Sequence, residues 1–175
     1  MRDKWELSAV SCMIAEDNPH MRTILRSVLT GFGIRTICEA SDGADALELV
    51  VDRRPDIVLC DWVMRPFGGN EFLQILRKDR DPDVSTTPVL VVTAHANRKT
   101  ILEAIEIGIH GFVAKPIAPA ILYRHIGEIL DRQLVHGRTK GLSEAGQQPP
   151  SRVSGSEALS GLAARAPADD GLALL

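Results

Sequence analysis

PDIVLCD, residues 55–61, holds the short apolar run IVLC, which follows Pro55 and Asp56 and ends at Asp61. Two further runs, SAVSCMIA at residues 8–15 and PVLVVTA at residues 88–94, are similarly apolar and do not alternate with charged residues. Such runs are typical of strands that are buried on both faces. Strands of this kind indicate a parallel sheet that is covered by helices on both sides.

Helical patterns separate the apolar runs. Two further segments, IRTICEA at residues 34–40 and GFVA at residues 111–114, are also predicted to be strands. With the three apolar runs they make five strands, each followed by a helical pattern. Right-handed crossovers between parallel strands then predict a doubly wound α/β fold. We expect a flavodoxin-like, five-stranded parallel sheet of order 2-1-3-4-5 with five helices. The helices are marked by apolar residues at helical spacing after Pro19, from Ala44 to Val51, around Phe72, around Ile101 and after Pro119.

The composition changes near Gly137. The chain has 175 residues, of which 45% are hydrophobic and 25% are charged, enough apolar material for one core. Residues 137–175 are instead rich in Gly, Ala, Ser and Pro and contain no aromatic residue. A segment of this kind does not bury enough surface to offset its ordering entropy. We therefore predict a folded domain over residues 1–136 and a disordered, low-complexity tail over residues 137–175.

Charge and cysteine content exclude several classes of protein. The net charge of −3 gives no indication of nucleic-acid binding. No apolar run approaches the roughly 20 residues that span a bilayer, and Glu6 interrupts the N-terminal region, unlike in a secretory signal. The three cysteines lie in apolar runs without zinc-site spacing, as small core residues do in a reducing compartment. We expect a cytoplasmic protein with no nucleic-acid or membrane partner.

Polar side chains gather where the predicted strands end. The first run ends in Glu16 and Asp17, the third in Asp61, the fourth in Thr93, and the fifth in Lys115. In doubly wound sheets, ligands bind beyond the carboxyl ends of the strands. The topology therefore predicts that three carboxylates, one hydroxyl and one ammonium group converge at one edge.

This set of groups suits a particular chemistry. Carboxylates packed together repel one another, and a hard cation such as Mg²⁺ relieves the repulsion through oxygen ligands. A metal next to a carboxylate and an ammonium group can neutralise and position a phosphoryl group during its transfer. An aspartate can act as the nucleophile and form an aspartyl phosphate.

Four stretches in order carry a family resemblance: IAEDNPHMR at 14–22, VLCDWVM at 58–64, VLVVTA at 89–94 and GFVAKP at 111–116. They resemble the receiver domains of two-component response regulators, and the resemblance covers roughly residues 8–134. It implies that Asp61 is the phosphoacceptor. It also implies that Glu16, Asp17 and Asp61, with the backbone carbonyl of Val63, bind the metal.

The resemblance extends to the strands that follow. It implies that Thr93 and Lys115 bind the phosphoryl oxygens and that Phe112 is an aromatic switch residue. The Lys115–Pro116 bond is a candidate for a cis peptide, which folded proteins reserve largely for bonds to proline.

This sequence departs from the family pattern at two places. Glu16 stands where many receivers have an aspartate, but it still supplies carboxylate oxygens. After Asp61 the usual Met-Pro pair is Met64-Arg65-Pro66, and Gly68 replaces the usual acid. We expect a different shape for this loop and no loss of a group that takes part in chemistry.

The sequence predicts a stand-alone receiver of the chemotaxis type. It would accept a phosphoryl group from a histidine kinase or a histidine phosphotransfer protein and signal to a downstream protein that the sequence does not identify. It would be a switch and not an enzyme. One alternative is a pseudo-receiver that acts by protein contact alone. Another is an aspartate-nucleophile phosphatase of the dehalogenase type. Those enzymes resemble one another in having a second aspartate two residues after the nucleophile, and this chain has Val63 at that position.

Overall fold

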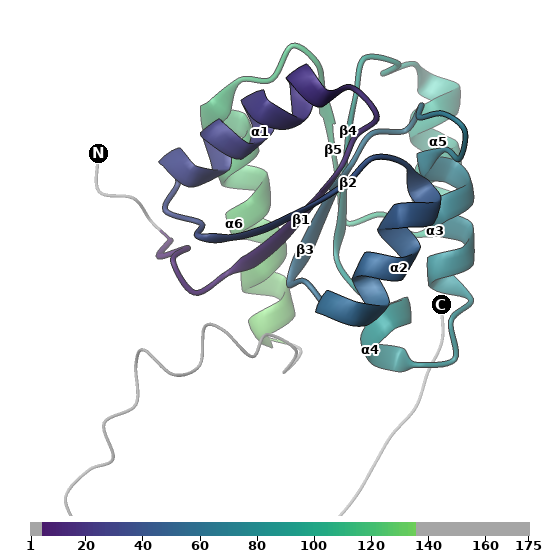
Figure 1. Cartoon of the computed structure of the whole chain (residues 1–175), viewed down its shortest axis with the longest axis horizontal. Helices are drawn as coiled ribbons and strands as arrows, with labels where there is room; N and C mark the ends of the chain where they lie inside the picture. The colour runs from purple at the N-terminus through teal and green to yellow at the C-terminus, as the bar shows by residue number, and fades with distance from the viewer. Residues whose placement is uncertain (1–4, 136–175) are drawn as a thin grey trace, which may run out of the picture.

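A five-stranded, all-parallel sheet forms the centre of the computed structural model, which describes residues 5–135 (Figure 1). The predicted tail at residues 137–175 lies outside the described residues. The strand order β2-β1-β3-β4-β5 confirms the order expected from the sequence. The strands are β1 Ser11–Ala15, β2 Thr36–Ala40, β3 Ile57–Cys60, β4 Val89–Thr93 and β5 Gly111–Ala114.

Six helices connect and follow the strands in the described part of the chain. Five of them match the helical patterns of the sequence, and α4 is an additional single turn. It forms because Asp81 accepts a hydrogen bond from the Asp83 N–H at 2.9 Å and Pro82 occupies the first helical position. The helices are α1 Pro19–Gly31, α2 Gly43–Arg53, α3 Gly69–Arg77, α4 Pro82–Ser85, α5 Arg98–Ile107 and α6 Pro119–Val135.

The sheet has an apolar layer on each face. Helices α1 and α6 cover one face, and α2, α3 and α5 cover the other (Figure 1). Along β1, Cys12 and Ile14 belong to the first layer, while Met13 and Ala15 belong to the second. Successive side chains of a strand point to opposite faces, so a strand between two layers is apolar at every position. This is the physical reason for the uninterrupted apolar runs.

Two local features bring helices close to the carboxyl edge of the sheet. Asn18 starts α1 by accepting hydrogen bonds from the N–H groups of His20 and Met21, at 2.9 and 3.3 Å. Gly69 starts α3 where a Cβ atom would lie 2.2 Å from the carbonyl oxygen of Asp61. Only glycine allows this approach. Both helices therefore begin immediately beside the ends of β1 and β3.

Within residues 5–135, none of the helices combines the length and hydropathy needed to cross a bilayer.

Candidate functional site

The two central strands place their acidic residues side by side. Ala15 of β1 is in register with Cys60 of β3. The Asp61 N–H donates to the carbonyl oxygen of Ala15 at 2.9 Å, so the ladder extends to the first residue beyond β3. On the other side, the Glu16 N–H donates to the carbonyl oxygen of Ala40 at 3.1 Å. Glu16 and Asp61 are thus both held by backbone hydrogen bonds at the carboxyl edge.

Three carboxylates form a cluster at this edge. Glu16, Asp17 and Asp61 each offer one oxygen, and these oxygens lie within 4.8 Å of one another. Glu16 is 2% exposed and Asp61 is 9% exposed, while Asp17 is the more accessible of the three. A set of carboxylate oxygens alone fits a hard divalent cation such as Mg²⁺. The fourth predicted ligand, the carbonyl of Val63, belongs to the residue whose N–H donates to Asp61 Oδ1 at 3.3 Å.

Lys115 joins two of these carboxylates. Its Nζ atom donates to Glu16 Oε2 at 2.6 Å and to Asp61 Oδ2 at 2.9 Å, and its side chain is 12% exposed. The Lys115 N–H donates to the carbonyl oxygen of Thr93 at 2.9 Å, which fixes the lysine at the end of β5 beside the end of β4. Charge-assisted hydrogen bonds of this kind are stronger than neutral ones. The lysine therefore compensates charge that two nearly buried carboxylates would otherwise leave unpaired.

The proton affinities of this group reflect burial and charge. Burial raises the pKa of Glu16, the hydrogen bond from Lys115 opposes that rise, and the charge of Asp61 adds to it. Burial lowers the pKa of Lys115, but its hydrogen bonds and attraction to Glu16 and Asp61 outweigh burial and leave the pKa above its ordinary value. Lys115 is accordingly a charged ammonium group at neutral pH.

Thr93 and Phe112 lie on β4 and β5 and do not belong to the carboxylate cluster. Thr93 ends β4, is fully buried, and accepts a hydrogen bond from the His95 N–H at its Oγ1 atom, at 3.2 Å. Phe112 pairs with Val91 across β4 and β5, is half-buried, and packs against the apolar layer under α2, α3 and α5. The hydroxyl thus lies at the same sheet edge as Lys115, and the ring lies three residues before the lysine.

The loop after Asp61 folds back over the cluster. Trp62 and Met64 are buried in the apolar layer, while the Arg65 N–H donates to Asp17 Oδ2 at 3.1 Å. The Arg65–Pro66 and Lys115–Pro116 peptide bonds are both cis. The residue that departs from the usual Met-Pro pair therefore supplies a backbone donor to the most accessible carboxylate of the cluster.

The sequence did not indicate two of these contacts. The guanidinium of Arg22 donates to the carbonyl oxygens of Glu16 and Asp17, at 2.7 and 3.4 Å. Arg22 lies in the stretch 14–22, but its spacing alone does not distinguish it from a surface cation on α1. The Arg65 N–H is a backbone group, so no residue type in the sequence points to it.

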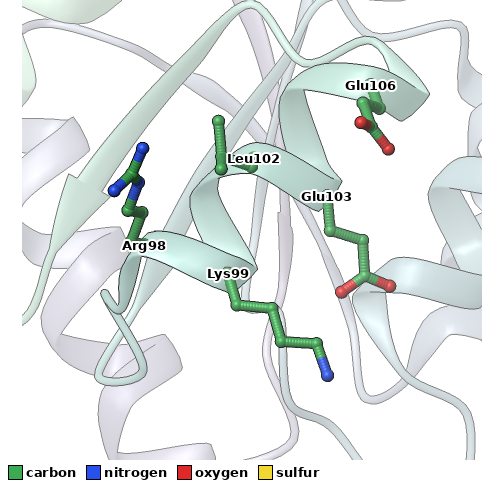
Figure 2. Close-up of a pocket in the computed structure, with 5 residues that line it drawn as sticks. All are labelled: Arg98, Lys99, Leu102, Glu103 and Glu106. Carbon is green, nitrogen blue, oxygen red and sulfur yellow. The ribbon is translucent and has the colours of Figure 1, made fainter.

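A pocket on the outer face of α5 is separate from the carboxylate cluster. None of the predicted site residues lines it (Figure 2). Glu103 accepts a hydrogen bond from Asn70 of α3, so the two helices are linked along one side of this face. The predicted site residues therefore lie at the strand ends and not in this pocket. Its lining residues are Arg98, Lys99, Leu102, Glu103 and Glu106.

Known proteins share both the sequence and the fold. The family model of the response regulator receiver domain matches residues 12–127. The chain is 34% identical over 120 residues to the chemotaxis protein CheY of Pseudomonas aeruginosa, covering 69% of this chain and 95% of the relative. It is 33% identical over 120 residues to chemotaxis protein CheY-3 of Vibrio cholerae, covering 69% and 91%.

Solved structures agree with these sequence relatives. A two-component response regulator of the LuxR family from Aurantimonas sp. SI85-9A1 is 29% identical, with a TM-score of 0.64 over 70% of this chain and 86% of that one. Chemotaxis protein CheY4 of Vibrio cholerae, at 23% identity and a TM-score of 0.63, shares the fold over 69% of this chain and 98% of its own.

Proposed function

The chain belongs to the response regulator receiver family, and from this premise we propose that it is a phosphoryl-accepting switch with Asp61 as the acceptor. A histidine kinase or a histidine phosphotransfer protein supplies the phosphoryl group, and a downstream protein partner responds to the resulting conformational change. One observation carries the proposal: Lys115 Nζ is hydrogen-bonded to both Glu16 and Asp61, at 2.6 and 2.9 Å. Acceptor, cation and metal-binding acid are thereby gathered in one place.

The transfer requires a carboxylate nucleophile. An oxygen of Asp61 attacks the phosphorus, the bond between phosphorus and the donor's imidazole nitrogen breaks, and its electron pair leaves with that nitrogen. The product is an aspartyl phosphate. The hydrogen bonds from Lys115 and from the Val63 N–H orient the two oxygens of Asp61 before the reaction. The Lys115 ammonium and the Thr93 hydroxyl then bind phosphoryl oxygens.

Glu16, Asp17 and Asp61, with the carbonyl of Val63, would hold Mg²⁺ at the same edge. The carboxylate oxygens fit this ion because they are hard ligands gathered within 4.8 Å. When bound, the ion supplies positive charge that offsets the negative charge of the phosphoryl oxygens. The protein's own residues supply the nucleophile and the orientation.

Two further parts of the proposal concern the protein's class and its compartment. The protein assists its own phosphorylation and dephosphorylation and does not turn over a separate substrate, so it is a switch and not an enzyme. We place it in the cytoplasm because Cys12, Cys38 and Cys60 are free thiols, as in a reducing compartment. Val63, two residues after Asp61, has no carboxylate and so argues against a phosphatase of the dehalogenase type.

The decisive experiment uses acetyl phosphate as the donor. With Mg²⁺ present, the intact protein should gain the mass of one phosphoryl group, and Asp61→Asn should gain none. Asp52→Asn is the matched control, because Asp52 is an exposed aspartate on α2 and its replacement should leave labelling unchanged. Equal labelling of wild type and Asp61→Asn would show that another residue is the acceptor. No labelling of the wild type would favour a pseudo-receiver.

A further inference from the structure

Arg22 is directed at the backbone of the acidic segment. It lies on α1, and its Nη1 atom donates to the carbonyl oxygen of Glu16 at 2.7 Å and reaches that of Asp17 at 3.4 Å. Its Nε atom lies 3.5 Å from Glu39 Oε2 on β2, and its side chain is 20% exposed. One guanidinium therefore connects α1, the edge strand β2 and the two acids after β1.

The orientation of a carbonyl group determines the direction of the neighbouring side chains. The peptide unit is planar, so fixing a carbonyl oxygen fixes the whole plane and leaves little freedom to the residues on either side of it. After Glu16 the chain leaves the sheet, and α1 begins only at Pro19. In this short connection, the contacts of Arg22 hold the peptide planes from which Glu16 and Asp17 project. The planar guanidinium lets Nε face Glu39 while Nη1 contacts the two carbonyl oxygens.

Arg26 provides an internal comparison. It lies one turn further along α1, also pairs with Glu39, and donates to the carbonyl oxygen of Ile37 at 3.3 Å. Both of these contacts are on β2, and its side chain is 45% exposed. Arg22 and Arg26 thus share helix, charge and acidic partner, but they differ in contact with the acidic segment.

We propose that Arg22 is a positioning residue for the metal site: it holds the Glu16–Asp17 segment so that both carboxylates meet that of Asp61. This inference rests on the proposed Mg²⁺ dependence. It makes a prediction opposite to that of simple electrostatics. A guanidinium near a cation site repels the cation, so removal of its charge should by itself strengthen binding. Loss of positioning should weaken binding.

The test measures Mg²⁺ affinity in the full chain. Trp62 follows Asp61 in the chain and should report binding by a fluorescence change, in a Trp5→Phe background that removes the only other tryptophan. Melting temperature against Mg²⁺ concentration gives a second readout by mass action. The variants are Arg22→Met, Arg22→Lys and Arg26→Met, compared with the parent.

We expect Arg22→Met to weaken Mg²⁺ binding by on the order of tenfold, the lower end of the range for residues that orient metal ligands. Arg22→Lys should lie between this variant and the parent, because an ammonium group can donate to the carbonyl oxygens but lacks the second nitrogen that faces Glu39. Arg26→Met should bind as tightly as the parent or slightly more tightly. If Arg22→Met does not fold, the Mg²⁺ affinity of Arg22→Lys tests the positioning role: weaker binding than in Arg26→Met supports it, and equal binding overturns it.

Two negative outcomes are distinct. If the parent binds Mg²⁺ and the Arg22 variants bind it as tightly as Arg26→Met does, the positioning role is overturned and the proposed function stands. If the parent itself binds no Mg²⁺ by either readout, the metal site of the proposed function is overturned, and the inference fails with it.

Discussion

His110 makes the stability of the domain depend on pH. It lies just before β5, where its Nδ1 atom accepts a hydrogen bond from the Val89 N–H at 3.3 Å and lies 3.4 Å from a nitrogen of Arg77. An acceptor at Nδ1 requires the neutral imidazole. Burial lowers the pKa of His110 from 6.5 to about 4, and the charges of Arg77 and Arg132 add to the effect. Protonation is therefore resisted in the folded state.

The magnitude follows from the two pKa values. The unfolded chain binds a proton near pH 6.5, and the folded chain binds it only near pH 4. Between these values the unfolded state holds more protons, so the free energy of unfolding decreases as the pH falls; above pH 6.5 the contribution is fully present. At about 1.4 kcal/mol per pH unit the upper limit is roughly 3 kcal/mol. Because the ring is partly exposed, solvent screening reduces this to about 2 kcal/mol.

Urea unfolding from pH 7 to pH 4.5 tests this expectation. In His110→Asn the amide oxygen can replace Nδ1 as acceptor, but the side chain does not titrate. From pH 7 to pH 4.5 the free energy of unfolding should fall by about 1.5–2 kcal/mol more in the wild type than in this variant. The contribution of the carboxylates is common to both proteins and cancels in this difference. His95→Asn, which changes an exposed histidine, should follow the wild type. Parallel curves for wild type and His110→Asn would refute the reasoning.

Four further outcomes are expected. Gly69→Ala should lower the free energy of unfolding, measured with urea, by roughly 3 kcal/mol and should slow phosphorylation by acetyl phosphate, because the added Cβ would lie 2.2 Å from the Asp61 carbonyl oxygen. Wild-type stability and labelling rate would contradict the close approach of α3 to Asp61. Millimolar Mg²⁺ should raise the melting temperature of the wild type but not that of the double variant Glu16→Ala, Asp17→Ala. An equal rise in both proteins would mean that the ion binds at another site. Val63→Asn should speed the decay of the phosphorylated protein, measured by intact mass, because an amide can orient the attacking water where the exposed valine shields it; an unchanged or slower decay would exclude that role. Phosphorylation should shift the NMR resonances of α5, β5 and α6, because Thr93 is expected to move toward the phosphoryl oxygen and Phe112 to turn inward. Shifts confined to the face of the domain opposite these elements would contradict this coupling between Asp61 and α5, β5 and α6.

Local pattern was sufficient for most of the fold. The uninterrupted apolar runs identified the three inner strands β1, β3 and β4, because a strand buried on both faces is apolar at successive positions. The edge strands β2 and β5, which are only partly buried, were identified at TICEA and GFVA between the helical patterns. Asn18 and Pro19 marked the start of α1, where the cap and the first helical residue are local choices. The one-turn α4 was not predicted, although Asp81 and Pro82 carry the corresponding signal, because four residues are too few to show a helical period.

In the candidate site, too, some features could be predicted from the sequence and others could not. The sequence by itself determined which groups end the strands, since Glu16, Asp61 and Lys115 each follow an apolar run directly. Only the tertiary structure decided that Lys115 bonds both acids, which lie 99 and 54 residues away in the chain. The contact of Arg22 with the acidic segment was likewise decided by the packing of α1 against the sheet. Strand ends follow from local hydrophobicity, but hydrogen bonds between distant groups depend on register and helix packing, which arise only when the whole domain folds.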